Sequence, residues 1–215
     1  MKSLLEEKKD WTKKEVMNAA KKIFFQKGYP NTSIEEIAQA ARVSKGTIYL
    51  YFKSKDELYL SLMFPTLEEL GRRFKDLEGK LTDGQLMNSK AIVMGFFEIF
   101  KKLYEDDPDG IRIIQAFQQG GLVSKMTGET GGEIDRYAKR NFSIARNIIS
   151  KAIKLDLIGK VNPAKIIDIF WGAFIGIVQL EESKLRATQK DHIFSTLEYA
   201  FLSMADHLCP GKKRS

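Results

Sequence analysis

Hydrophobic residues recur every three or four positions through most of this 215-residue chain, as they do in helices with one buried face. No stretch shows the strict alternation that marks a half-buried strand. Capping residues and breakers divide the pattern into about nine predicted helices: 12–27, 34–41, 45–52, 55–78, 85–105, 109–124, 133–158, 163–184 and 188–208. We therefore expect an all-α protein.

Three helix starts follow one another closely within residues 33–57. Ser33 and Ser54 are each followed three residues later by glutamate, which is the pattern of a capping box. Between them, Ser44 is placed to cap a short helix that runs to about Phe52. Only residues 42–44 separate this helix from the one before it, so the spacing predicts a helix-turn-helix.

The second helix of this motif has two different faces. At about 100° per residue, Ile48 and Phe52 share the side that would pack on the preceding helix. Gly46 and Leu50 point away from that side, and this leaves a surface that is poorly suited to water. Such a surface suits the major groove of DNA, where a recognition helix meets base edges.

The same residues carry a family resemblance. Residues 32–58 contain the run Thr-x4-Ile-Ala-x2-Ala-x-Val-Ser-x-Gly-x2-Tyr-x-Tyr-Phe-x2-Lys-x2-Leu, which resembles the DNA-binding signature of the TetR family of transcriptional repressors. The resemblance covers roughly residues 12–58. One departure is Arg42, which stands where the family usually has glycine, so we expect this residue in the left-handed region.

The expected roles in DNA binding differ from residue to residue. Hydroxyl and ammonium groups suit phosphate oxygens, whereas Gly46, Thr47 and Leu50 are placed to set sequence preference. Lys45, Lys55, Tyr49 and Tyr51 are the expected phosphate contacts. The complete predicted DNA-binding set is Thr32, Ser33, Ser44, Lys45, Gly46, Thr47, Tyr49, Leu50, Tyr51 and Lys55.

The resemblance implies two domains. Residues 1–54 would form the helix-turn-helix domain, with helix 12–27 covering its apolar back. Residues 55–215 would form a larger helical domain for effector binding and dimerisation. Helix 55–78, kinked at Pro65, would connect the two. We expect residues 1–10 to fray, and residues 125–132 to form a loop.

Net charge supports a polyanionic partner for the N-terminal part. The chain carries a formal charge of +7. Residues 1–60 hold twelve Lys or Arg against eight Asp or Glu, so more than half of the excess lies in little more than a quarter of the chain.

The last two predicted helices indicate a homodimer. Between Ile166 and Leu180 only Asp168 and Gln179 are strongly polar, and a helix that is apolar all round needs cover on more than one side. A four-helix contact, two helices from each chain, would supply that cover, as the resemblance also implies. The expected interface consists of Ile169, Gly172, Phe174, Gly176, Leu197, Phe201 and Met204.

The resemblance also implies an effector cavity among the middle helices. Their aromatic residues suit a largely apolar ligand. The residues expected to line the site are Phe64, Phe97, Phe100, Phe117, Gln118, Tyr137 and Trp171. Two alternatives remain open: a DNA-binding protein controlled by a protein partner, which a closed interior would favour, and an enzyme or carrier with a vestigial helix-turn-helix.

Catalytic, metal and cofactor patterns are absent from the sequence. His192 and His207 lie too far apart to share a metal within one chain, and no phosphate loop or zinc motif occurs. We therefore expect a regulator without cofactors. The lone Cys209 fits a reducing cytoplasm, and the longest apolar run, residues 169–178, is shorter than a membrane span.

Overall fold

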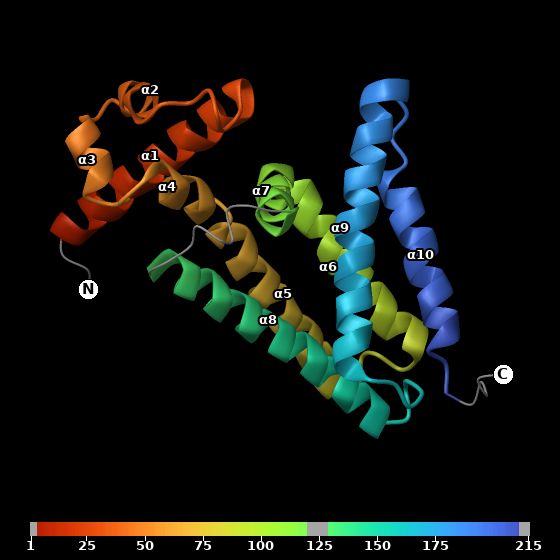
Figure 1. Cartoon of the computed structure of the whole chain (residues 1–215). Helices are drawn as coiled ribbons and strands as arrows, with labels where there is room; N and C mark the ends of the chain where they lie inside the picture. Colours follow the sequence, from red (N-terminus) through yellow and green to blue (C-terminus); the bar gives the residue numbers. More distant parts are fainter. Residues whose placement is uncertain (1–3, 120–128, 211–215) are drawn as a thin grey trace. The chain divides into compact units, whose positions relative to one another are not determined.

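The computed structural model describes residues 4–119 and 129–210, and every regular element in these ranges is a helix (Figure 1). The expected all-α class is confirmed. The ten helices of these ranges are α1 (Leu4–Lys27), α2 (Ile34–Ala40), α3 (Lys45–Tyr49), α4 (Lys55–Ser61), α5 (Phe64–Thr82), α6 (Ser89–Asp106), α7 (Pro108–Gln119), α8 (Glu129–Lys154), α9 (Pro163–Thr188) and α10 (Ile193–His207).

The chain forms two compact units. Unit 1 comprises Met1–Pro65 and Asp109–Ile134, and unit 2 comprises Thr66–Pro108 and Asp135–Ser215. This division differs from the predicted boundary after residue 54, because α4 packs against α1 and so belongs to unit 1.

Helix α1 provides the back of unit 1. Its residues Val16 and Ala20 are completely buried, and Phe24 is nearly so, where α1 packs against α2 and α4. The helix begins at Leu4 and not near residue 12, so the expectation of a frayed start was wrong for residues 4–10. Thr12, where the sequence suggested a helix start, lies inside the helix, and its hydroxyl donates to the Lys8 carbonyl one turn earlier, at 2.9 Å.

The predicted helix 55–78 is in fact two helices. α4 ends at Ser61 and α5 begins at Phe64, with Pro65 as its second residue. Proline is tolerated there because the first N–H groups of a helix need no partner within it. The Leu62 and Met63 amides bond three residues back, to Tyr59 and Leu60, which tightens the end of α4. The break lies where the chain passes from unit 1 to unit 2.

Three other helix starts differ from the expected ones. α6 begins at Ser89 because the Asn88 side chain accepts from the Ala91 amide at 2.8 Å. α8 begins at Glu129, within the expected loop 125–132, whose first residues lie outside the described ranges. α10 begins at Ile193, after the left-handed residue Gln189 has closed α9.

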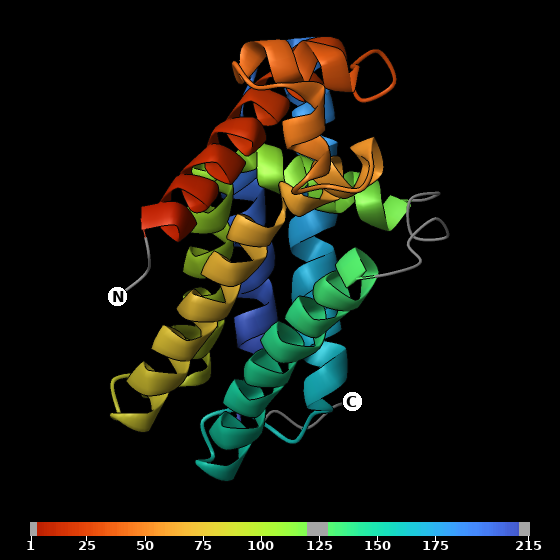
Figure 2. The same cartoon turned by 90° about the vertical axis from the view of Figure 1, so that its left-hand side faces the viewer.

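An aromatic cluster forms the core of unit 2, where α10 packs between α6 and α9 (Figure 2). Phe100 stacks on Phe174 with ring centroids 4.8 Å apart and an interplanar angle of 10°. Phe201 approaches Phe170 and Phe100 at 5.2 and 5.8 Å. Each of these rings is at most 2% exposed, so together they bury a large apolar area.

Helices α5 and α8 approach each other closely at a glycine. The Asn141 amide on α8 donates to the Leu67 carbonyl of α5 at 2.6 Å, and Asn141 is 1% exposed. A Cβ atom on Gly71 would lie only 2.4 Å from Asn141 Oδ1. Gly71 therefore leaves the space that this buried hydrogen bond occupies.

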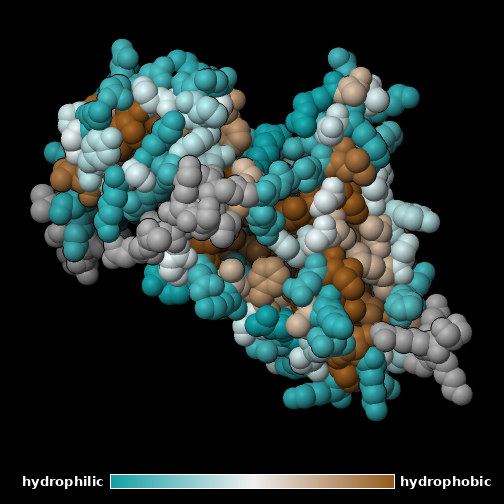
Figure 3. Space-filling model, in the orientation of Figure 1, coloured by the Kyte–Doolittle hydropathy of each residue, from teal (hydrophilic) through white to brown (hydrophobic). Residues whose placement is uncertain are grey.

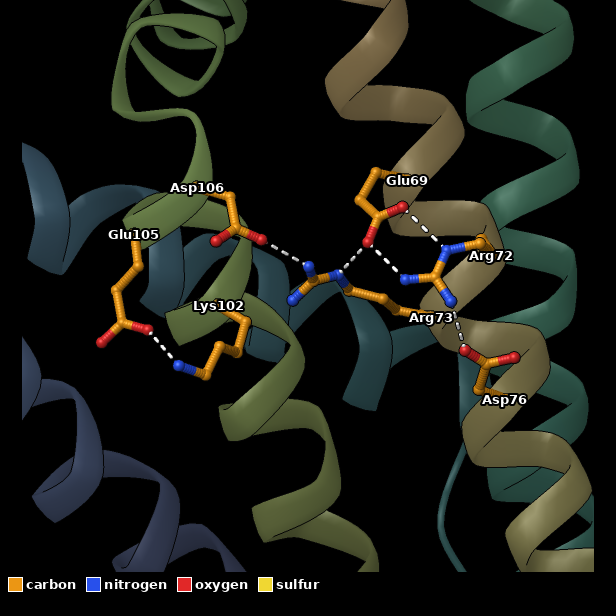
Figure 4. A network of polar contacts seen from close by, with 7 residues as sticks. All are labelled: Glu69, Arg72, Arg73, Asp76, Lys102, Glu105 and Asp106. Carbon is orange, nitrogen blue, oxygen red and sulfur yellow. Dashed lines mark hydrogen bonds and ion pairs between the residues drawn. The ribbon is translucent and has the colours of Figure 1, made fainter.

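Ion pairs connect α5 to α6 (Figure 4). Arg73, which is 16% exposed, contacts Glu69 on its own helix and Asp106 on α6, each at 2.6 Å. Arg72 bonds to the same Glu69 carboxylate, and this bond is the main reason why the pKa of Glu69 falls to about 2. The network aligns the first half of α5 with the end of α6.

Helix α9 leaves apolar surface uncovered. Figure 3 shows an apolar strip over this helix, on which Ile169 and Leu180 are about half exposed. Of the helices in the described ranges, α9 alone has the length and composition that a membrane crossing needs, with a mean hydropathy of 1.4 and 22% of that window buried. The expectation that the protein has no membrane partner therefore stays a prediction.

We predict that Gly71→Ala destabilises the protein. The added methyl displaces Asn141 and leaves a buried amide without its partner, at a cost of roughly 1–3 kcal/mol in the free energy of unfolding. Urea denaturation measures this change. Gly79→Ala, on the same helix where a Cβ meets nothing within 4 Å, is the matched control. It should stabilise by about 1 kcal/mol because alanine favours helix. Equal effects of the two substitutions would contradict the proposed role of Gly71.

Candidate nucleic-acid interface

The capping box at the start of α2 forms as predicted. The Ser33 hydroxyl accepts from the Glu36 amide at 3.2 Å, and Glu36 Oε2 accepts from the Ser33 amide at 2.9 Å. Lys27 donates to the other carboxylate oxygen at 2.5 Å. These bonds, the one from Lys27 first, lower the pKa of Glu36 to about 2. The Ser33 side chain therefore orients the start of α2.

The turn between α2 and α3 contains the expected left-handed residue. Arg42 has φ 56°, which confirms the prediction at the position where the family usually has glycine. The Arg42 amide donates to the Gln39 carbonyl at 3.2 Å and the Val43 amide to the Ala38 carbonyl at 3.0 Å. This pair of bonds is a Schellman motif, which closes α2 and turns the chain toward Ser44.

Helix α3 presents the face that its sequence predicted. Ser44 caps it by accepting from the Thr47 amide at 3.0 Å, and the two hydroxyls bond at 2.9 Å. Ile48 is fully buried, as the packing face requires. Tyr49 is 46% exposed and Leu50 82%. α3 thus exposes a large aliphatic side chain and a phenol beside Gly46, with no cover from unit 1.

Lys45 is not a free cation on this face. Its ammonium forms an ion pair with Glu35 of α2 and lies 5.9 Å from the centre of the Tyr49 ring. The bond to Glu35 raises the pKa of Lys45 and lowers that of Glu35. Both side chains are at least half exposed, so solvent screens the pair. A phosphate would compete with Glu35 for this ammonium.

Two residues of the predicted DNA-binding set have structural roles. Thr32 is 3% exposed, and its hydroxyl donates to the Gly28 carbonyl at 2.9 Å, so its side chain is not a surface contact. Lys55 donates to the carbonyls of Tyr29 and Thr32 at 3.0 and 2.9 Å, and lies 4.5 Å from the centre of the Tyr29 ring. Two of its three donors therefore hold the loop between α1 and α2.

The sequence pattern gave no sign of this arrangement around Lys55. Tyr29 also packs against Tyr59, with ring centroids 4.8 Å apart, and Phe24 approaches Tyr59 at 5.0 Å. Burial in this cluster raises the pKa of Tyr59. The cluster joins α1, the loop after it and α4. Its members are too far apart in sequence for any periodicity to indicate that they meet.

The predicted effector residues are divided between the two units. Phe64, Phe117 and Gln118 belong to unit 1, whereas Phe97, Phe100, Tyr137 and Trp171 belong to unit 2. Within unit 2, Phe100 lies 5.9 Å from Trp171, but Phe97 packs on Phe201 and Tyr137 stacks with Arg140. The structure therefore does not assemble these residues into one described site.

A small enclosed void lies beside Phe100 and Trp171. Its volume is about 10 Å³, against roughly 300–1,000 Å³ for ordinary ligand pockets. The indole N–H of Trp171 is buried without a hydrogen-bond partner in the described residues. The void is lined by Leu70, Phe74, Phe96, Phe100, Phe142, Ile167, Phe170 and Trp171. In this conformation side chains fill the space around these rings.

The predicted dimer residues also fall into two groups. Ile169 is 51% exposed, Gly172 and Gly176 are exposed, and Met204 is half-buried. Phe174, Leu197 and Phe201 are completely buried inside unit 2. These three were wrong as interface residues, because they point into the core of their own chain.

Metal chemistry finds no support in the described ranges, where no cluster of three His, Cys, Asp or Glu side chains is placed to hold an ion. The exposed cysteine, Cys209, accepts a hydrogen bond from the Ser89 hydroxyl at 3.3 Å.

Comparison with known proteins agrees with this geometry. Residues 16–62 match the family described as bacterial regulatory proteins, tetR family. The uncharacterized HTH-type transcriptional regulator YuxN of Bacillus subtilis is 48% identical over 48 residues, which are 22% of this chain and 16% of that protein. The uncharacterized HTH-type transcriptional regulator YhgD of Bacillus subtilis is 26% identical over 188 residues, which are 86% of this chain and 92% of that protein.

Solved structures share the fold. The transcriptional regulator FadR from Bacillus subtilis, in complex with stearoyl-CoA, superposes with a TM-score of 0.65 at 20% identity, over 89% of this chain and 96% of that one. The matched stretch 16–62 contains the exposed α3 face and the helices that position it. Residues 16–62 therefore form a DNA-binding domain of the TetR family, and over most of its length the chain is similar to transcriptional regulators and not to enzymes.

Proposed function

We propose that this protein is a homodimeric repressor that binds a palindromic operator and is released from it by a small, largely apolar effector. The exposed face of α3 carries the proposal. Leu50, the C-cap residue of the five-residue helix α3, is 82% exposed, whereas Ile48 on the opposite side of the helix is buried. An exposed leucine beside glycine gains from contact with thymine methyl groups, which major-groove binding supplies.

Within this proposal α3 combines two kinds of contact. Gly46, Thr47 and Leu50 meet base edges and set the preferred sequence. Tyr49 and Tyr51 direct their hydroxyls to phosphates, as does Lys45 once phosphate replaces Glu35. Thr47 has one hydroxyl bond, to Ser44, and retains capacity for a second partner.

Dimerisation through α9 and α10 is supported by the uncovered strip of α9. Gly172 and Gly176 lie one turn apart on its exposed side, and a Cβ at either position meets nothing within 4 Å in the chain itself. A second α9 is therefore able to approach closely there. The dimer would place two α3 helices about 34–36 Å apart, one turn of DNA. Its location would be the cytoplasm, where the operator lies.

The effector part of the proposal rests on the aromatic interior of unit 2. FadR of Bacillus subtilis has been solved with stearoyl-CoA, and an acyl-bearing molecule would suit the rings around Phe100 and Trp171 here. Because the present void is only about 10 Å³, such a ligand must displace side chains. That movement would oppose DNA binding by a coupling free energy of typically ~1–3 kcal/mol.

A second function is favoured by the same small void. A regulator of this fold that answers to a protein partner needs no internal cavity, and the filled interior agrees with that alternative. In both functions the protein binds DNA through α3. The functions differ in whether a small molecule or a protein partner releases the protein from DNA.

The DNA interface is tested by selecting bound duplexes from a random pool at about 150 mM salt, where non-specific binding is weakened. We expect a palindromic consensus, and recovery of none from folded protein would contradict the proposal.

Leu50→Ala should lower affinity for the selected duplex by roughly 1–3 kcal/mol while leaving affinity for a random duplex unchanged. Equal decreases on both duplexes would remove Leu50 from the base-reading set.

The dimer interface is tested by Gly176→Arg. We expect a monomer in sedimentation that keeps its helical content and still unfolds cooperatively, because Gly176 is exposed and a Cβ there meets nothing within 4 Å in the protomer. Gly79→Arg adds the same charge and volume on α5, where a Cβ also meets nothing within 4 Å, and should leave the dimer intact. A Gly176→Arg protein that sediments like the unmodified one would place the interface elsewhere.

The effector is tested by thermal unfolding with stearoyl-CoA and with stearic acid. A ligand at a hundred times its Kd should add about 2.7 kcal/mol to the free energy of unfolding. Operator DNA should weaken that ligand by the factor by which the ligand weakens DNA binding. No stabilisation by either compound would favour the protein-partner alternative, and equal ligand affinity with and without operator would exclude an effector role.

A further inference from the structure

The positive charge of the N-terminal part does not lie on the helix-turn-helix. Residues 28–60 hold four Lys or Arg and four Asp or Glu, so their formal charge is zero. Residues 1–27 hold eight Lys against four Asp or Glu. The whole excess of +4 within residues 1–60 therefore belongs to the stretch that contains α1.

Interactions within unit 1 reduce the charge available from the helix-turn-helix further. Lys45 is paired with Glu35, and Lys55 donates to two backbone carbonyls. Arg42 is exposed, in the turn between the helices. A surface of this kind has little attraction for the phosphate backbone, which normally supplies much of the affinity for DNA.

Helix α1 extends beyond the core that it covers. Residues 4–15 precede Val16, the first completely buried residue of the helix, and are mainly exposed. At 1.5 Å per residue this extension is about 18 Å long. Its large hydrophobic residues Leu4 and Trp11 are 86% and 64% exposed, so no buried apolar face explains a helix here, and most of its other residues are polar.

Two lysines of the extension continue the stripe by which α1 packs on unit 1. Lys9 and Lys13 stand seven and three residues before Val16, on the side of the helix that carries Ala20 and Phe24. The Lys13 ammonium lies 5.7 Å from the centre of the Phe52 ring, three residues after the end of α3. The stripe thus passes beside the C-terminal end of α3.

Both lysines are exposed, and Lys13 also contacts the Phe52 ring. Neither Lys9 nor Lys13 forms an ion pair with any residue in 4–119 or 129–210. Lysines one turn apart on a helix suit a row of phosphates as point charges.

We propose that the N-terminal extension of α1 is a second DNA-binding element, in which Lys9 and Lys13 bind backbone phosphates beside the groove segment read by α3. This inference rests on the proposed DNA-binding function and identifies where its electrostatic part lies. α3 selects the sequence, whereas the α1 extension supplies sequence-independent attraction and counterion release.

The test compares two double variants of the full chain with equal charge. Lys9→Gln with Lys13→Gln removes the two ammonium groups proposed to bind phosphate. Lys8→Gln with Lys22→Gln removes two exposed lysines from the opposite side of the same helix. Fluorescence anisotropy with a duplex of random sequence between 50 and 200 mM salt measures the slope of log affinity against log salt, and it requires no operator.

We expect the first double variant to flatten the slope by about 0.9 for each phosphate that it no longer neutralises, which is about 3.5-fold in affinity per phosphate across this salt range. The second should keep the slope of the unmodified protein. Equal slopes in the two variants, or no binding of the unmodified protein at 50 mM salt, would overturn the inference. Failure of the proposed function is distinguishable from failure of this inference, because it would appear as the absence of a selected palindrome.

A control for folding is needed, because Lys13 also stacks on Phe52. The single variant Lys9→Gln leaves that stacking in place and should flatten the slope by itself. Thermal unfolding of both variants separates a decrease in stability from a decrease in phosphate binding. An unchanged slope in a folded Lys9→Gln protein counts against Lys9 whatever the double variant does.

Discussion

The buried stripe of α1 is the packing interaction on which the DNA interface depends. Val16, Ala20 and Phe24 cover the apolar backs of α2 and α4, and without them a five-residue helix such as α3 has no reason to persist in water. Lys55 completes this support by bonding to the carbonyls of the loop after α1. Orientation of α3 is therefore a property of the whole unit.

The aromatic residues of unit 2 form its core and do not line a large pocket. The rings of Phe100, Phe174 and Phe201 fill the space between α6, α9 and α10, and they leave a void of only about 10 Å³. One surface that remains for other molecules is the exposed strip of α9, which carries Gly172 and Gly176 together with aliphatic side chains. Dimerisation would thus use the exposed side of α9, whereas effector binding would displace buried side chains on its other side.

Much of the candidate site was predictable because its geometry is local. A cap acts within three residues, so Ser33 and Ser44 were found from their neighbours alone. The left-handed turn at Arg42 was expected from the family resemblance, because the family usually has glycine at this position. Thr32 and Lys55 were misjudged because their bonds join residues that no periodic pattern relates, such as Lys55 and Tyr29.

By itself, the sequence determined the all-α class, the caps at Ser33, Ser44 and Ser54, the exposed face of α3 and the class of partner, since each depends on residues within one or two turns. Tertiary structure alone decided which side of each apolar helix is core. Phe174 and Gly176 are two residues apart on α9, yet Phe174 is buried and Gly176 is exposed. Helical spacing places them on different faces but does not say which face meets α10. That choice depends on how α6, α9 and α10 fill space together.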